Sequence, residues 1–117
     1  MNFPSGRKTF ATPDGRRNGD LLSLGMSGLH PIEPEAMDLG ETKRALAGRA
    51  CVIGNVSVDL LARGTPDEIR KAVETCMSVG APGGGYMISS GNCIPAYARL
   101  ENAEAMIRAV AELQGRY

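Results

Sequence analysis

The sequence predicts an α/β fold in which about three parallel strands are each followed by a helix. Strands are expected to begin near residues 29, 50 and 86, and each is followed by a segment with helical signals. This alternation is typical of parallel strands joined by right-handed crossovers. Three such units are too few to close a barrel, and a chain of 117 residues forms at most one small domain.

The composition argues against several classes of function. The 13 basic and 13 acidic residues cancel, which disfavours a nucleic-acid or membrane-surface binder that relies on bulk charge. No apolar run approaches the roughly 18 residues of a membrane span, and no signal-peptide core follows Met1. The three cysteines are odd in number and far apart, so we expect no disulfide framework and a cytoplasmic location. With a single histidine, this chain alone cannot support a mechanism that needs two.

The N-terminal stretch 1–18 lacks a periodic apolar pattern and is rich in Gly, Pro, Ser and Thr. We therefore expect a polar, disordered tail here and one domain over 19–117. The basic pairs of this stretch suggest a phosphate-binding arm as an alternative. An interleaved aspartate and the scarcity of aromatic residues favour a solvated tail instead.

The first strand and helix of the domain are short. Leu29–Ile32 is a short run that we expect to form a strand, and a turn with Pro34 comes next. Asp38 and Glu41 have the spacing of a capping box, which predicts a helix that ends before Gly48.

The second strand and helix carry the clearest signals. Residues 50–53 are continuously apolar, as expected for a strand that is covered on both faces. After a loop, Thr65–Val79 has the pattern of a helix. Thr65 caps this helix, Pro66 suits its first turn, and Glu68 completes a capping box.

The third unit begins after a run of glycines at 83–85. Tyr86–Ser89 is the expected strand and Leu100–Leu113 the final helix, with small and apolar side chains recurring on one side. Phosphate-binding glycines follow a strand and open a helix. Because these glycines precede a strand, we assign them a structural role and reject nucleotide binding through them.

Polar side chains follow the carboxyl ends of the three expected strands. In a parallel α/β protein these ends face one way and carry substrate contacts. The side chains are those of Glu33, Glu35, Asn55, Asp59, Ser89, Ser90, Asn92, Cys93 and Tyr97. The loop 55–65 leads into a helix N-terminus with Arg63 beside it, which suits a carboxylate. A well-capped helix with a solvated arginine is the alternative.

Each candidate also has a purely structural interpretation. Glu33 is a general acid or base if it is desolvated, and otherwise an exposed loop carboxylate. Asn55 and Asn92 either line a site or shape turns. Cys93 is a nucleophile or a metal ligand, but without a histidine nearby in the sequence an inert thiol is favoured. For His30, inside a strand run, a core or interface position is favoured over a catalytic one.

Five motifs in order resemble the C-terminal part of the uroporphyrinogen decarboxylase superfamily over residues 20–117. Each is weak alone, but their order and spacing match together. They are Gly28-Leu-His-Pro-Ile-Glu-Pro34, Ile53-Gly-Asn-Val56, Gly64-Thr-Pro-Asp-Glu-Ile69, Gly83-Gly-Gly-Tyr86, and Ser89-Ser-Gly-Asn-Cys-Ile-Pro95 with Glu101-Asn102. That family is a (β/α)8, TIM-type barrel. The resemblance implies that this chain forms a partial barrel with about the last three strands.

The superfamily contains two kinds of enzyme. Its decarboxylases are lyases of porphyrin biosynthesis that need no cofactor, and its methyltransferases use zinc and act with a corrinoid protein partner. By resemblance, we expect a carboxy-lyase that acts on a small anionic substrate and binds no metal. A fragment of a zinc- and corrinoid-dependent methyltransferase is the alternative. From their positions after the strands, we take Glu33, Asn55 and Asn92 as the catalytic candidates, and Arg63, Ser89, Ser90, Cys93 and Tyr97 as the substrate-binding candidates.

Several positions depart from the family patterns. Asn92 stands where decarboxylases have the histidine of Gly-His-Gly, and Ser57 where they have an aspartate. Cys93 comes one residue later than the zinc-binding cysteine of the methyltransferases, and their His-x-Cys pair is missing. Three strands also leave two unpaired edges. We therefore expect the isolated chain to be incomplete and inactive, and to need a complementing barrel half or a homo-oligomer. A non-catalytic truncated product is a further alternative.

Overall fold

The computed structural model describes residues 22–46 and 48–117. The expected polar tail at 1–18 lies outside the described residues. Within the described part of the chain, no helix is both long and apolar enough to cross a lipid bilayer.

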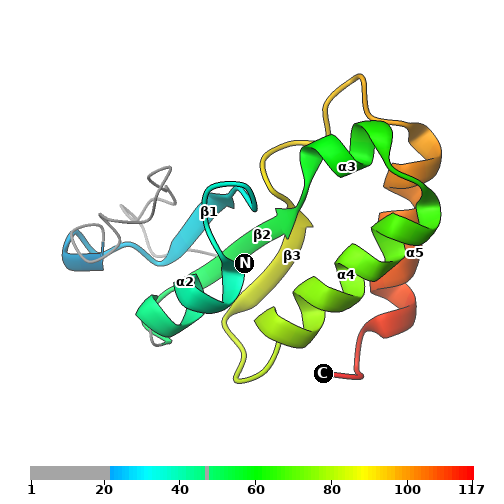
Figure 1. Ribbon diagram of the computed structural model, residues 1–117. Helices are drawn as coiled ribbons and strands as arrows, with labels where there is room; N and C mark the ends of the chain where they lie inside the picture. Colours follow the sequence, from blue (N-terminus) through cyan, green and yellow to red (C-terminus); the bar gives the residue numbers. More distant parts are fainter. Residues whose placement is uncertain (1–21, 47) are drawn as a thin grey trace.

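Three parallel strands form the sheet, in the order β1-β2-β3 (Figure 1). They are β1 (Gly28–Ile32), β2 (Cys51–Val56) and β3 (Tyr86–Ser90), and each starts within one residue of its predicted start. Because both pairings are parallel, the carboxyl ends of all three strands meet at one edge of the sheet. The structure confirms the predicted α/β class.

The three predicted helices are present as α2 (Leu39–Leu46), α4 (Pro66–Gly80) and α5 (Leu100–Leu113). Their caps explain where they begin. Asp38 Oδ1 accepts the Glu41 N–H at 2.8 Å before α2. At α4, Thr65 Oγ1 accepts the Glu68 N–H at 3.3 Å and Glu68 Oε2 accepts the Thr65 N–H at 3.2 Å. This is the predicted capping box.

The segment before α4 is a further helix, α3 (Val58–Arg63), so the expectation of a loop here is wrong. Ser57 begins the helix, because its Oγ accepts the Leu60 N–H at 3.3 Å. Gly64 ends it by donating its N–H to the Leu60 carbonyl at 2.7 Å. Six residues are too few for a periodic apolar pattern. The available signal was the capping serine with Asp59 in the first turn.

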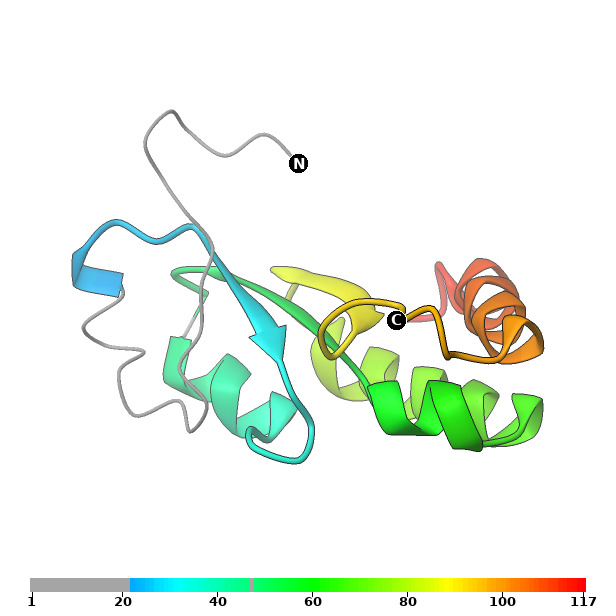
Figure 2. The same ribbon diagram turned by 90° about the horizontal axis from the view of Figure 1, so that it is seen from above.

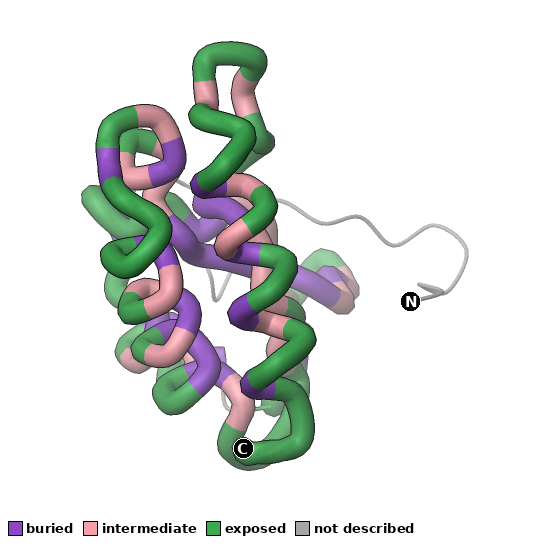
Figure 3. Tube along the Cα trace, turned by 90° about the vertical axis from the view of Figure 1, so that its right-hand side faces the viewer, coloured by how far each residue is buried: buried purple, intermediate pink, exposed green. Residues whose placement is uncertain are grey.

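The helices lie on one face of the sheet. Figure 2 shows α2, α3 and α4 on the same side of the strands, with α5 beside α4. Buried residues lie where the helices face the sheet, while residues on the outer faces of α4 and α5 are exposed (Figure 3). No described helix packs on the opposite face of the sheet. The core includes Leu29, Ile32, Val52, Leu61, Ile69 and Val73.

Candidate functional site

A cavity of about 350 Å³ opens at the carboxyl ends of the strands, and we call it the strand-end cavity. Three segments that are far apart in the sequence supply its walls: the loop after β1, the start of α3, and the loop after β3. The structure thus brings together side chains that the sequence placed at this edge. The lining residues are Glu33, Pro34, Glu35, Val58, Asp59, Asn92, Cys93 and Tyr97.

Glu33 and Asn92 face each other across this cavity from different loops. Asn92 Nδ2 donates a hydrogen bond to Glu33 Oε1 at 3.4 Å, and both side chains are exposed. A long, exposed hydrogen bond of this kind leaves the carboxyl group free to reorient toward a ligand. A carboxyl group at the mouth of a cavity, oriented by an amide, is a candidate proton donor.

Gly91 determines where Asn92 lies. Its N–H donates to the Val56 carbonyl at 2.6 Å, which ties the loop after β3 to the end of β2. A Cβ at this position would lie 2.9 Å from Pro34 Cδ. Only glycine allows the loops after β1 and β3 to approach so closely.

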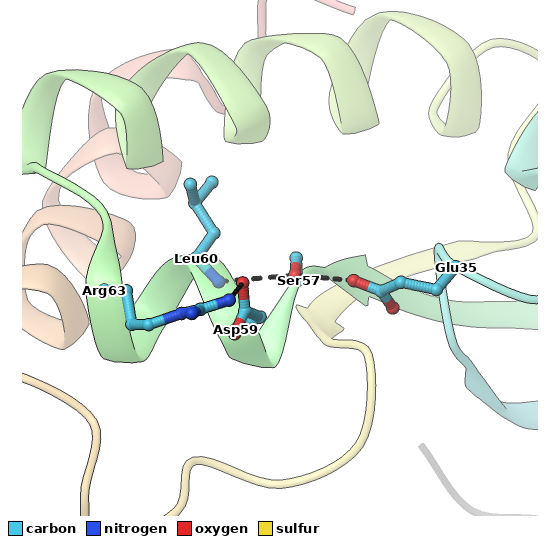
Figure 4. A network of polar contacts seen from close by, with 5 residues as sticks. All are labelled: Glu35, Ser57, Asp59, Leu60 and Arg63. Atoms are coloured by element: carbon cyan, nitrogen blue, oxygen red, sulfur yellow. Dashed lines mark hydrogen bonds and ion pairs between the residues drawn. The ribbon is translucent and has the colours of Figure 1, made fainter.

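A chain of polar contacts connects the loop after β1 with α3 (Figure 4). Ser57 Oγ donates to Glu35 Oε1 at 2.8 Å while it caps α3 through the Leu60 N–H. Further along the same helix, Arg63 Nη2 donates to Asp59 Oδ2 at 2.7 Å, and this hydrogen bond raises the pKa of Arg63. Arg63 is therefore engaged with a carboxylate of its own helix and does not line the strand-end cavity.

The strand-end cavity is acidic. Three of its lining residues, Glu33, Glu35 and Asp59, carry carboxylates, and none of the lining residues is basic. Such a wall attracts cationic groups and hydrogen-bond donors and repels anions. The carboxylates of an anionic substrate would therefore need cations from outside this wall.

Asn55 and the two serines lie elsewhere. Asn55 is buried, with 8 % of its surface exposed, and accepts a hydrogen bond from Cys76 Sγ at 3.5 Å on the helix face of the sheet. Ser90 is also buried, and Ser89 Oγ donates to the Ser90 carbonyl at 2.7 Å. None of the three lines the strand-end cavity. Successive side chains of a strand point to opposite faces, so proximity to a strand end does not bring a side chain into the cavity.

The described residues do not supply a ligand set for zinc. Among them, no group of three or more His, Cys, Asp and Glu side chains is arranged to hold a metal ion. Cys93 is exposed in the strand-end cavity, whereas His30 is half-buried in β1 with Nδ1 3.2 Å from the Ile53 carbonyl oxygen. A tetrahedral zinc site needs three or four well-placed ligands. Such a site would therefore require residues beyond those described.

Val58 and Pro34 line the strand-end cavity, although neither was predicted from the sequence to be a site residue. Val58 is the first residue of α3, a helix that was not predicted. Ser57, the capping residue before it, is the sequence feature that indicates this helix. Pro34 lies in the turn after β1, and its proximity to Gly91 depends on packing between loops that are far apart in the sequence.

Comparison with known proteins gives consistent matches. A family model described as uroporphyrinogen decarboxylase (URO-D) matches residues 19–113. The chain is 30 % identical to a uroporphyrinogen decarboxylase of Methylobacillus flagellatus over 81 residues, which are 69 % of this chain and 23 % of the relative. It is 27 % identical to one of Shewanella frigidimarina over 117 residues, 98 % of this chain and 33 % of the relative. The chain thus spans between about a quarter and a third of the length of these relatives.

A solved structure has the same fold. A methyltransferase from Methanosarcina mazei superposes with a TM-score of 0.76 over 93 % of this chain and 32 % of that chain, at 22 % identity. Three parallel strands with helices on one face correspond to an arc of its β/α barrel. The predicted partial barrel and the predicted superfamily are confirmed. This chain belongs to the uroporphyrinogen decarboxylase (URO-D) family.

Proposed function

We propose that this chain supplies the C-terminal arc of a decarboxylase of the uroporphyrinogen type, and that it acts only when the rest of a barrel is present. The strand-end cavity carries this proposal, because it collects side chains from three successive strand–helix loops at the edge where barrel enzymes place their chemistry. The family match supports the reaction class. The free cysteines Cys51, Cys76 and Cys93 fit the cytoplasmic location that we propose with it.

The acidic wall suits a reaction that passes through a cation. In decarboxylation of a pyrrole acetate, protonation of the ring makes the ring an electron acceptor. The bond between the methylene and carboxylate carbons then breaks, its electron pair moves into the ring, and CO2 leaves. A proton added to the exocyclic methylene carbon forms the methyl group, and the ring returns its extra proton. This sequence needs no cofactor.

Glu33 is the proton donor that we propose, with Asn92 orienting its carboxyl group. Glu35 and Asp59 stabilise the positive charge that develops on the ring. Cys93 and Tyr97 contact the substrate at the rim of the cavity. Asn55, Arg63, Ser89 and Ser90 have no direct role in this proposal, because they do not line the cavity.

The substrate's own carboxylates need cations that the described cavity wall does not contain. We therefore propose that a complementing barrel half provides them. The shape of the sheet supports this. Among the described residues, no strand pairs with the outer edge of β1 or of β3, and no helix covers the face opposite the helices (Figure 2). Exposed strand edges of this kind readily pair with further strands.

Reconstitution tests the proposal. The chain is mixed with the part of the Shewanella frigidimarina enzyme that lies outside its match to this chain, here called the barrel complement, and CO2 release from uroporphyrinogen is measured. We expect activity only from the mixture. We expect Glu33→Gln to lower kcat about a hundredfold or more, while the control Glu41→Gln, on α2, leaves it unchanged. Turnover by the chain alone would refute the requirement for a complement.

A methyltransferase is the second candidate, because the solved structure with the same fold bears that name and an exposed thiol, Cys93, lies in the cavity. It would use zinc and a corrinoid protein, with further zinc ligands from the complement. Methylation of a thiol substrate by a methylated corrinoid protein, dependent on added zinc, tests it in the same mixture. Binding of the complement with neither activity would favour a non-catalytic, barrel-completing role.

A further inference from the structure

We infer that the chain has a second binding site, a cavity of about 200 Å³ between α2 and α4 on the helix face of the sheet, for a small neutral ring compound with one hydrogen-bond acceptor. We call it the interhelical cavity. It is separate from the strand-end cavity, and Pro34 is the one residue that lines both. The inference does not depend on the proposed decarboxylase function.

Most of the wall is apolar. Met37 lies just before α2, Leu39 is the first residue of α2, and Val79 comes from the last turn of α4. Met37 and Leu39 are buried, with 6 % of their surface exposed in each case, whereas Val79 is 42 % exposed at the mouth. A comparable apolar cavity of about 150 Å³ holds a benzene molecule, so this cavity accommodates one substituted ring.

One buried polar group is available to a ligand. The Asn55 side chain lines the cavity and is more than nine-tenths buried. Its Oδ1 accepts a hydrogen bond from Cys76 Sγ at 3.5 Å, but its Nδ2 has no hydrogen-bond partner among the described residues. Nδ2 is not among the described buried side-chain atoms that lack a partner, so it is open to the cavity that Asn55 lines. A carbonyl oxygen on a bound molecule would accept its N–H in place of solvent.

The other polar groups of the wall are already paired or lie at the rim. The Thr75 hydroxyl donates to the Lys71 carbonyl at 3.0 Å. Asp38, an exposed carboxylate, accepts the Glu41 N–H that caps α2. None of the lining residues is basic, so an anionic ligand would find no partner. These features select a neutral molecule with an apolar body and one acceptor.

Titration followed by NMR tests this inference. The 15N-labelled chain is titrated with benzamide and, separately, with toluene, which has the ring but no acceptor. We expect saturable shifts at the backbone amides of Asn55, Thr75, Cys76 and Val79, with benzamide binding about fivefold more tightly than toluene. Shifts that do not saturate, equal affinities for the two compounds, or saturable shifts confined to Glu33, Asn92 and Cys93 would overturn it.

Two substitutions on α4 locate the site. Val79→Phe fills the mouth, and because Val79 is partly exposed the larger side chain leaves the core intact; we expect the benzamide shifts to disappear. Ser78→Phe adds the same ring at an exposed position that does not line the cavity, and we expect benzamide to bind as before. Asn55→Leu removes the donor, and we expect it to bring the affinity for benzamide down to that for toluene. Benzamide binding unchanged by Val79→Phe would refute the assignment.

Discussion

At the scale of single residues, Gly91 and Asn102 hold the loops around the strand-end cavity. Gly91 packs against Pro34 where any side chain would collide. Asn102, fully buried, lies in the first turn of α5, and its Nδ2 donates to the carbonyls of Leu61 at 3.0 Å and Gly64 at 2.9 Å. Asn102 thus fastens the end of α3, whose beginning forms part of the cavity wall, to α5. Neither residue lines the cavity, so we regard both as positioning residues.

We expect Gly91→Ala to destabilise the chain by roughly 1–3 kcal/mol, because the new methyl group collides with Pro34. The displaced loop also separates Asn92 from Glu33, so kcat in the reconstituted mixture should fall further than KM rises. Thermal unfolding and reconstitution kinetics measure the two effects. Ala96→Ser, in an exposed part of the same loop, is the control. An unchanged melting temperature with unchanged kinetics would contradict this role.

Substitutions of Asn102 separate the loss of its hydrogen bonds from the effect of charge. Asn102→Leu leaves the Gly64 carbonyl without a donor and removes one of the two donors to the Leu61 carbonyl, which keeps the Arg99 N–H at 3.1 Å; it should cost about 1–3 kcal/mol. Asn102→Asp places a buried carboxylate against those carbonyls. The folded state then favours the protonated acid, so the loss should be small below about pH 4 and grow as pH rises. Denaturant unfolding from pH 4 to 8 measures this. If the free energy of unfolding of the Asn102→Asp variant did not change with pH, the side chain at position 102 would not be buried against these carbonyls.

A buried thiol, Cys76, and a partly buried phenol, Tyr86, predict a loss of stability in alkali. Burial raises the pKa of Cys76 from its ordinary value of 9.0, and burial together with Cys76 raises the pKa of Tyr86. Because the folded chain holds these protons more tightly than the unfolded chain, the free energy of unfolding should be unaffected below about pH 9 and fall above it.

Denaturant unfolding between pH 8 and 11 measures this fall. Cys76→Ser removes the titrating thiol and should make the decline less steep. Equal slopes for Cys76→Ser and the unsubstituted chain would show that Cys76 does not contribute.

At the scale of elements, the turn between α4 and β3 is supported by a residue from α2. Lys43 Nζ donates to the carbonyls of Gly80, Pro82 at 3.0 Å and Gly84 at 2.9 Å. The last turn of α4 contains no basic residue, so Lys43 supplies the positive charge that a helix C-terminus favours. The glycines at 83–85 have φ between +67° and +80°, which agrees with the structural role predicted for them.

Lys43→Met should destabilise the chain by about 1–3 kcal/mol, since three carbonyls lose a charged donor. Arg44→Met changes the neighbouring exposed cation of the same helix and should have an effect within about 0.5 kcal/mol. The comparison by urea unfolding isolates the capping contribution. Equal effects of the two substitutions would mean that only net charge matters.

At the scale of the whole molecule, the sheet is open. Within the part of the chain that the structure describes, the outer strands β1 and β3 each have one edge without a paired strand, and one face of the sheet has no helix upon it (Figure 2). Met87 belongs to that face: Tyr86 packs against Gly80 on the helix side, so the next side chain points the other way. Met87 is 40 % exposed. An arc of a barrel with such a surface is expected to associate, either with itself or with a complement.

We expect the isolated chain to elute as oligomers in size-exclusion chromatography with light scattering, and to form a defined complex with the barrel complement. Met87→Lys should weaken that complex at least tenfold, because it places a charge on the face that a closed barrel buries. Leu24→Lys introduces the same charge at a side chain that is 75 % exposed, and it should leave the affinity for the complement unchanged. If the isolated chain were a monomer that unfolded cooperatively and did not bind the barrel complement, the expectation that it associates would be wrong.

Much of the fold could be predicted because its signals are local. The capping pair Thr65 and Glu68 located α4, and the apolar period located α5 at Leu100–Leu113, the bounds observed. The six-residue helix α3 was missed because it is shorter than two turns. Its ion pair between Asp59 and Arg63 has the spacing of helical neighbours, a signal that the prediction did not use.

The alternation of strands and helices, the parallel order, and the edge at which polar side chains collect could all be read from local patterns in the chain. These follow from capping, periodicity and chain connectivity, which act over short distances along the chain. Packing in three dimensions turns Asn55 toward the helices rather than the strand-end cavity, pairs Arg63 with Asp59, and brings three carboxylates to one wall. Those outcomes depend on packing between segments distant in the sequence, and no local pattern encodes them.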